Sequence, residues 1–283
     1  MAFDCPNSED LISAYRITPG DTVKLADRPC RDETFFHEKD DAEQSLEVDA
    51  DAIDELQDKL FAERTRALLV ILQGIDTAGK SGTTKAVFAK TSPVGMQVKA
   101  YKAPSAEEAA HDYLWRVHEA VPRKGYIGIF DRSHYEDVLV PKARGLLDAK
   151  IIDQRYDQIN AFEKHLTENG VVILKFHLHI SHTEQGERLK ARLEKPHKRW
   201  KFNPGDLEDR AIWDRYIDAY ETMLNRCSTE HAPWHTIPSD SKTRRNATIA
   251  RIVRQKLEEM NPDYPDPGYR LDDFDIKNES TEF

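Results

Sequence analysis

The chain has 283 residues, a third of them charged, and its formal net charge is −10. This length allows one sizeable α/β core with extensions, or at most two small domains, and the negative charge opposes general binding to nucleic acids and anionic membranes. The spacing of Cys5, Cys30 and Cys227 suits neither a zinc site nor a disulfide framework. The N-terminus lacks a secretory pattern and no stretch reaches about 18 apolar residues, so we expect a soluble, cytoplasmic protein that binds neither nucleic acid nor membrane.

Helical and strand patterns alternate along the chain. Residues 1–40 are polar and contain Pro6, Pro19 and Pro29, so we expect an irregular arm that lies on the core. Apolar residues at helical spacing predict a helix over about 40–67. Apolar runs predict five strands: ALLVILQG (67–74), VKAYKAP (98–104), GYIGIFD (125–131), GVVILKFHLHI (170–180) and PWHTIP (233–238). Helical patterns separate these strands at about 79–91, 105–121 and 152–169, and before and after 233.

This alternation predicts a three-layer α/β/α sandwich with about five parallel strands, in one domain over 41–261. The charged helical segment 182–230 looks too polar for the core, and we expect it to form a lid over the strand ends, where parallel sheets bind ligands. Within it, WDRYIDAYETML (213–224) favours a core-facing helix over an aromatic platform for bases. The Pro- and Asp-rich tail, 262–283, is expected to be loosely ordered.

The loop after the first strand has the form of a phosphate-binding loop. GIDTAGKS (74–81) fits the pattern G-x-x-x-x-G-K-[ST] and lies between a buried strand and a helix. Glycines let backbone N–H groups approach phosphate, and the helix N-terminus favours an anion at the same place. A glycine-rich turn without a ligand is the alternative. The predicted phosphate-binding residues here are Gly74, Ala78, Gly79, Lys80, Ser81, Gly82 and Thr83.

Two aspartates predict a metal ion beside this loop. Asp76 lies inside the loop, where a bare carboxylate would repel phosphate, but a bound Mg²⁺ would reverse that interaction. Asp131 ends the third strand, a usual position for a second metal anchor, and Arg132 after it suits phosphate oxygens. Alternatively, Asp76 orients or deprotonates an acceptor, or points away from the loop.

Other candidates lie near the same strand ends. Glu136 and Asp137 are either outer metal ligands or a solvated helix start, and Glu136 is included in the predicted metal site. Lys102 follows the second strand, which could bring it to the phosphates. The region 106–118, AEEAAHDYLWRVH, predicts one amphipathic helix.

A concentrated basic segment, RLKARLEKPHKRWKFNPGD (188–206), stands out in this acidic chain. Helical spacing places some of its cations on one face until Pro196 ends the helix. A solvated charged face is the alternative, but acidic partners at i,i+4 look nearly absent, which favours a highly charged phosphate ligand. The predicted phosphate-binding residues of the segment are Arg188, Arg192, Lys198, Arg199 and Lys201.

Four motifs together resemble the polyphosphate kinase 2 family over about residues 10–258. They are GIDTAGKSGT (74–83), KAPSAEEAAHDYLWR (102–116), GIFDRSHYEDVLV (128–140) and RLKARLEKPHKRWKFNPGDL (188–207). YEDVLV and KRWKFNP resemble the subgroup, class III, that accepts AMP as well as ADP. The resemblance implies a P-loop kinase fold with a helical lid, similar to thymidylate kinase.

The resemblance also implies an activity and the residues that perform it. The activity is transfer of the terminal phosphoryl group of inorganic polyphosphate to AMP or ADP, giving ADP or ATP, with Mg²⁺ or Mn²⁺. By motif match the catalytic set is Asp76, Lys80, Asp131 and Arg132, while Arg192 and the cluster 198–201 meet phosphate. The family is usually a homo-oligomer, often a tetramer. Two alternatives stay open: an ATP-dependent kinase for a nucleotide or small molecule, and a non-catalytic sensor of nucleotide or polyphosphate.

Overall fold

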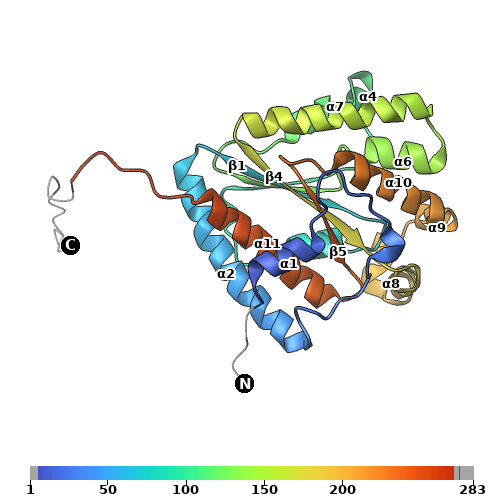
Figure 1. Cartoon of the computed structure of the whole chain (residues 1–283), viewed down its shortest axis with the longest axis horizontal. Helices are drawn as coiled ribbons and strands as arrows, with labels where there is room; N and C mark the ends of the chain where they lie inside the picture. Colours follow the sequence, from blue (N-terminus) through green and yellow to red (C-terminus); the bar gives the residue numbers. More distant parts are fainter. Residues whose placement is uncertain (1–5, 271–273, 275–283) are drawn as a thin grey trace, which may run out of the picture.

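The computed structural model describes residues 6–270 and residue 274. Within them, five strands form one sheet in the order β2-β3-β1-β4-β5, and every neighbouring pair is parallel (Figure 1). The strands are β1 (Ala67–Gln73), β2 (Met96–Ala100), β3 (Ile127–Asp131), β4 (Val171–His179) and β5 (Trp234–Pro238). The central strand β1 is buried along its whole length, as its continuous apolar run indicated. The predicted parallel sheet of five strands is confirmed.

Helices cover both faces of the sheet and complete the three layers. One face carries α2, α3 and α11, which contact one another, and the other carries α6, α7 and α10 (Figure 1). The longer helices are α2 (Lys39–Glu63), α6 (Glu136–Arg144), α7 (Ala149–Glu168), α8 (His182–Glu194), α10 (Trp213–Cys227) and α11 (Lys242–Met260). The shorter ones are α1 (Ser8–Tyr15), α3 (Lys80–Val87), α4 (Ala106–Ala110), α5 (Trp115–Ala120), α9 (Gly205–Ala211) and the 3-10 helices η1 (Leu25–Asp27) and η2 (Pro196–Lys201).

The N-terminal segment is more regular than an irregular arm. Asn7 caps α1 by accepting hydrogen bonds from the backbone N–H groups of the first turn, and Leu11 is fully buried. The chain then runs along the edge strand β5, where the N–H of Ile17 donates to the carbonyl of Trp234 (2.8 Å). The segment therefore lies on the core as predicted, and it also shields an exposed sheet edge.

The single helix predicted over 106–118 is wrong. The structure has α4 and α5 instead, with extended backbone at His111 between them. The Asp112 carboxylate accepts a hydrogen bond from the N–H of Leu114 (2.9 Å), which diverts the backbone from the helical pattern. The second short helix then presents Arg116, which is 5% exposed, to the strand ends.

The segment predicted as a lid has two parts. Its first part, α8, η2 and α9, follows the carboxyl end of β4, as expected for a lid (Figure 1). Its second part, α10, buries Tyr220, Met223 and Leu224 in the core, which confirms the core-facing helix predicted over 213–224. The expectation that the whole of 182–230 is too polar for the core is wrong there. Residues 262–270 form neither helix nor strand, and most of the rest of the predicted loose tail lies outside the described residues. No helix in the described part of the chain is both long and apolar enough to cross a membrane.

Candidate active site

The loop between β1 and α3 wraps the N-terminus of α3. Gly79 is the N-cap of that helix with a φ of +115°, a conformation that side chains disfavour. A Cβ at Gly74 would lie 2.9 Å from the carbonyl oxygen of Leu178, so glycine is also required where the loop leaves the sheet. Thr77 adopts a left-handed φ of 70° between them. The loop has the geometry that the motif predicted, because its tight turns leave the N-terminus of α3 facing the strand ends.

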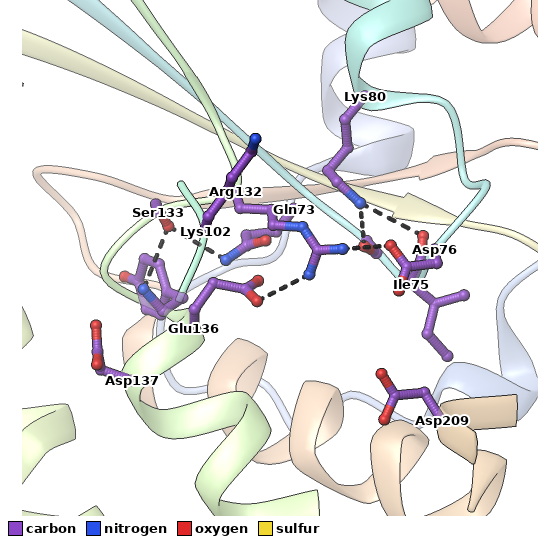
Figure 2. A network of polar contacts seen from close by, with 12 residues as sticks. Gln73, Ile75, Asp76, Lys80, Lys102, Arg132, Ser133, Glu136, Asp137 and Asp209 are labelled. Carbon is purple, nitrogen blue, oxygen red and sulfur yellow. Dashed lines mark hydrogen bonds and ion pairs between the residues drawn. The ribbon is translucent and has the colours of Figure 1, made fainter. Parts of the chain in front are cut away.

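Lys80 lies at the centre of the charges around this loop. Its side chain is buried, and Nζ donates to the carbonyl oxygen of Gly74 at 2.7 Å (Figure 2). Burial lowers the pKa of Lys80 and the nearby Arg132 adds to the decrease, while the carboxylates of Asp76, Asp131 and Glu136 oppose it. The structure thus brings Lys80 together with four of the charged groups that the sequence singled out: Asp76, Asp131, Arg132 and Glu136.

Arg132 explains why an aspartate is tolerated in a phosphate loop. The residue has a left-handed φ of 65° directly after β3, which turns its side chain back to the loop. Its guanidinium contacts the Asp76 carboxylate on one side and donates to Glu136 Oε2 (2.9 Å) on the other (Figure 2). Burial lowers the pKa of Arg132, but Glu136 and Asp76 outweigh it and raise the pKa. The loop aspartate is therefore paired with a cation and does not point away.

Asp131 and Ser81 form an oxygen-rich pair beside Lys80. The Ser81 hydroxyl donates to Asp131 Oδ2 at 2.6 Å, joining the start of α3 to the end of β3. In the described part of the chain no three His, Cys, Asp or Glu side chains group as a metal site, so the predicted set Asp76, Asp131 and Glu136 is not assembled as one. A Mg²⁺ ion needs only one or two carboxylates because it keeps several waters. The pair of Ser81 and Asp131 oxygens fits that requirement.

A cavity of about 460 Å³ opens beside Arg132. Lys102 and Arg116 line it from one side, and Asn203 reaches it from the lid. The Tyr101 hydroxyl, in the wall of this cavity, is buried and has no hydrogen-bond partner in the described part of the chain. Arg116 Nη2 binds Asp137 (3.0 Å), so Asp137 is an ion-pair partner and not a solvated helix start. Sequence reasoning missed Tyr101 and Arg116, although an arginine between apolar residues of a short helix is a detectable signal.

The basic segment of the lid is partly neutralised. Arg188 Nε binds Glu184 (2.7 Å) and Lys190 Nζ lies 3.7 Å from Glu194, so the expectation of nearly absent partners at i,i+4 is wrong for these two cations. Arg192 Nη1 binds Asp206 (3.0 Å), a partner 14 positions further along the chain. Burial raises the pKa of Asp206 and the carboxylate of Asp76 raises it further, while Arg192 and Arg132 oppose the increase. By contrast, four cations have no carboxylate within ion-pair distance among the residues described here: Lys195, Lys198, Arg199 and Lys201.

A buried polar network supports the turn that carries Asp131 and Arg132. Its core is the ion pair between Lys175 Nζ and Glu163 Oε2 (2.6 Å), both fully buried. Burial raises the pKa of Glu163, but Lys175 and His134 outweigh it and hold the pKa below its usual value. The network reaches the turn through His134, whose ring nitrogen lies 3.1 Å from Glu163. Sequence reasoning missed it, because only the fold brings α7, β4 and this turn together.

The chain is similar to several known proteins. A family model described as Polyphosphate kinase 2 matches residues 36–265. The AMP/ADP-polyphosphate phosphotransferase of Meiothermus ruber is 44% identical over 254 residues, which cover 89% of this chain and 95% of that protein. The ADP-polyphosphate phosphotransferase of Rhodopseudomonas palustris is 36% identical over 89% of this chain and 91% of its own length. The crystal structure of polyphosphate kinase 2 from Arthrobacter aurescens TC1 superposes with a TM-score of 0.89 at 39% identity, covering 95% of each chain.

Proposed function

The chain belongs to the polyphosphate kinase 2 family, and we propose that it transfers the terminal phosphoryl group of inorganic polyphosphate to AMP or ADP. The observation that carries this proposal is the pairing of a phosphate loop, with Lys80 and Arg132 in place, with lid cations that have no carboxylate partner among the described residues. A donor with one negative charge on every phosphate needs such a lid, whereas ATP needs fewer cations.

The transfer requires positioning and charge screening more than proton chemistry. An oxygen of the acceptor's terminal phosphate attacks the terminal phosphorus of polyphosphate, and the bond from that phosphorus to the bridging oxygen breaks. The shortened polyphosphate leaves with the bond's electron pair on its new terminal oxygen. A phosphate monoester has a second pKa of about 6, so the acceptor is already largely ionised near neutral pH. Lys80 and Arg132 stabilise the charge on the transferring group.

We propose Mg²⁺ or Mn²⁺ as the cofactor, held by Asp131 and Ser81, whose oxygens already lie 2.6 Å apart. Such an ion would neutralise phosphate oxygens and fix their orientation. Asp76 and Glu136 are the second candidates for metal ligands. They rank after Asp131 because both carboxylates form ion pairs with Arg132 in this structure.

We place the acceptor nucleotide in the cavity of about 460 Å³ beside Arg132, which has the size of a small-molecule site. Lys102, Arg116 and the unpartnered Tyr101 hydroxyl offer hydrogen-bond donors there. Polyphosphate then approaches along the basic part of the lid. This arrangement lets the two polyanions meet at Lys80.

The direct test supplies the purified protein with polyphosphate, Mg²⁺ and either AMP or ADP, and measures ADP and ATP by chromatography. We expect product from polyphosphate and none after exhaustive chelation with EDTA. Activity that persists after chelation would contradict the metal assignment. Turnover with ATP alone and none with polyphosphate would favour the ATP-dependent alternative, and binding without turnover would favour a sensor.

We also propose a cytoplasmic location, where nucleotide acceptors are available, and a homo-oligomer, with a tetramer as the expected size. The resemblance of the four sequence motifs to a family of usual homo-oligomers supports association. Light scattering on the purified protein measures the mass, and a monomer at working concentration would contradict the oligomer.

A further inference from the structure

Arg188, on the first helix of the lid, α8, forms hydrogen bonds with the phosphate loop. Its Nη1 donates to the carbonyl oxygens of Thr77 (2.9 Å) and Ala78 (3.1 Å). Its Nη2 donates to the carbonyl oxygens of Ser239 (2.7 Å) and Asp240 (3.0 Å), between β5 and α11. The sequence predicted that Arg188 binds phosphate, but both its Nη atoms donate to backbone carbonyls, its Nε donates to Glu184, and its side chain is 9% exposed.

Arg245, on α11, approaches the same loop from another direction. Its Nη1 donates to the Ala78 carbonyl oxygen at 2.8 Å, so two guanidinium groups share that one acceptor. A Cβ at Gly79 would lie 2.0 Å from Arg245 Nη1, so this arginine occupies the space that a side chain at that position would need. Its other donors reach the side-chain oxygen of Asn246, which accepts a hydrogen bond from Thr83 of α3 as well.

These contacts act on a strained part of the loop. Thr77 is a non-glycine residue with φ 70°, a conformation that persists only where the surroundings hold it. The two arginines are buried close together, and burial together with the Arg188 charge lowers the pKa of Arg245 to about 9. Within the described residues Arg245 has no carboxylate partner, so an anion bound in the loop is the charge that would favour it.

We propose that Arg188 and Arg245 are positioning residues for phosphoryl transfer, which hold the Thr77 and Ala78 carbonyls away from the phosphate so that the N-terminus of α3 faces it. Carbonyl oxygens repel phosphate, and the backbone N–H groups bind it only when the carbonyls turn outward. We call the contacts of Arg188 and Arg245 with the Thr77 and Ala78 carbonyls the clamp. Because Arg188 lies on the lid helix α8, the clamp also fixes the position of α8 relative to the loop. This inference rests on the proposed function.

The substitutions Arg188→Lys and Arg245→Lys test the clamp. Lysine keeps the positive charge but offers a single donor group in place of a planar fork, so it cannot hold several carbonyls in the same way. We expect each variant to lose at least about tenfold in kcat/KM for polyphosphate. The double variant should lose less than the product of the two effects, because both arginines hold the Ala78 carbonyl.

Arg244→Met is the matched control on the same helix. Arg244 also donates to backbone carbonyls, those of Phe36 (2.6 Å) and His37 (2.5 Å), but these belong to the N-terminal segment and not to the loop. We expect kinetic constants within about twofold of the unmodified protein, even if the melting temperature falls.

Tripolyphosphate binding, followed as a shift in melting temperature, separates this inference from the proposed function. The unmodified protein and Arg244→Met should show the full shift, and the two lysine variants at most half of it. If the protein showed no polyphosphate-dependent turnover but still bound tripolyphosphate, the proposed function would be refuted. The comparison of melting-temperature shifts would then still test whether the two arginines position the loop. Lysine variants with unchanged kinetics and an unchanged shift would overturn the clamp. Three other results would also overturn the clamp. These are no shift in melting temperature with tripolyphosphate, failure of both lysine variants to fold, and a loss of kcat/KM in Arg244→Met equal to that in the lysine variants.

Discussion

The two halves of the site treat charge in opposite ways. Around the phosphate loop each charged group has a partner: Lys80 binds a loop carbonyl, Arg132 bridges Asp76 and Glu136, and Asp131 accepts from Ser81. In the lid beyond α8, the cations of residues 195–201 have no carboxylate partner among the described residues, although Arg199 Nε donates to the carbonyl oxygen of Leu193 (2.9 Å), and Trp200 is exposed. We call the phosphate loop with Lys80, Asp131, Arg132 and Glu136 the fixed half, and we call residues 195–201 the open half.

This difference matches the two parts of a polyphosphate donor, its transferring terminal phosphoryl group and the rest of its chain. The transferring phosphorus always occupies one place, so dipoles and charges fixed in advance stabilise it best. The rest of a polyphosphate chain varies in length and position, so cations without carboxylate partners, which attract any phosphate, serve it better. We therefore expect changes in the fixed half to reduce turnover and changes in the open half to reduce chain binding.

The largest effect is expected from Lys80→Ala and Asp131→Asn in the fixed half. Each removes one group that neutralises the transferring phosphoryl group or holds the metal, and a loss of about 100- to 1,000-fold in kcat is typical of such a change. Both variants should stay folded, because each changes one polar side chain at the end of the sheet and leaves the apolar core around β1 unaltered. Lys85→Ala is the control, since Lys85 lies exposed on the same helix α3. Near-normal turnover of either variant would contradict the assigned roles.

The next largest effect concerns the buried ion pair of Glu163 and Lys175, which lies next to the turn that carries Asp131 and Arg132. Glu163→Gln leaves Lys175 as a buried charge without its partner, which costs about 3–5 kcal/mol in the free energy of unfolding. Because the folded pKa of Glu163 is lowered, its contribution is present above its unfolded pKa of about 4.3 and is lost as the pH falls through the folded value. Urea unfolding at pH 7 and near pH 3 should therefore show a large difference that shrinks in acid.

Glu168→Gln, on the same helix α7, is the control for this measurement. Glu168 pairs with Lys164 at 3.8 Å, but both side chains are 63% exposed, so we expect a change below about 1 kcal/mol. Equal losses in the two variants, or a difference that grows in acid, would mean that the Glu163 pair does not support the turn.

The fixed half could largely be predicted from sequence, and the reason is local. The loop motif, the strand before it and the Asp131–Arg132 pair are each encoded by adjacent residues, and the strand ends of a parallel sheet bring them together. Arg245 could not be predicted as a loop residue, because its contact with Ala78 joins positions 167 apart in the chain. Only the packing of α11 against α3 makes that contact.

Two errors show what helical periodicity leaves out. The i,i+4 rule considers partners within one helix, so it did not find Asp206, which meets Arg192 after the chain turns at Pro196. Periodicity also merged α4 and α5, because it takes no account of the Asp112 side chain that accepts a backbone hydrogen bond. In both places a side chain interacted across a chain turn, which a count of apolar positions does not detect.

The smallest expected effect belongs to the open half, and it is the one that separates the halves most clearly. Lys198→Ala and Lys201→Ala each remove one unpaired cation, so KM for long polyphosphate should rise by up to about tenfold while kcat changes little. The rise should shrink with tripolyphosphate, which extends less far along the lid, and in high salt, which screens exposed charges. Lys190→Ala is the control, because Lys190 already pairs with Glu194 on α8. If these lid variants lowered kcat for every chain length equally, the open half would act on the transferring group itself, and the division between the halves would be wrong.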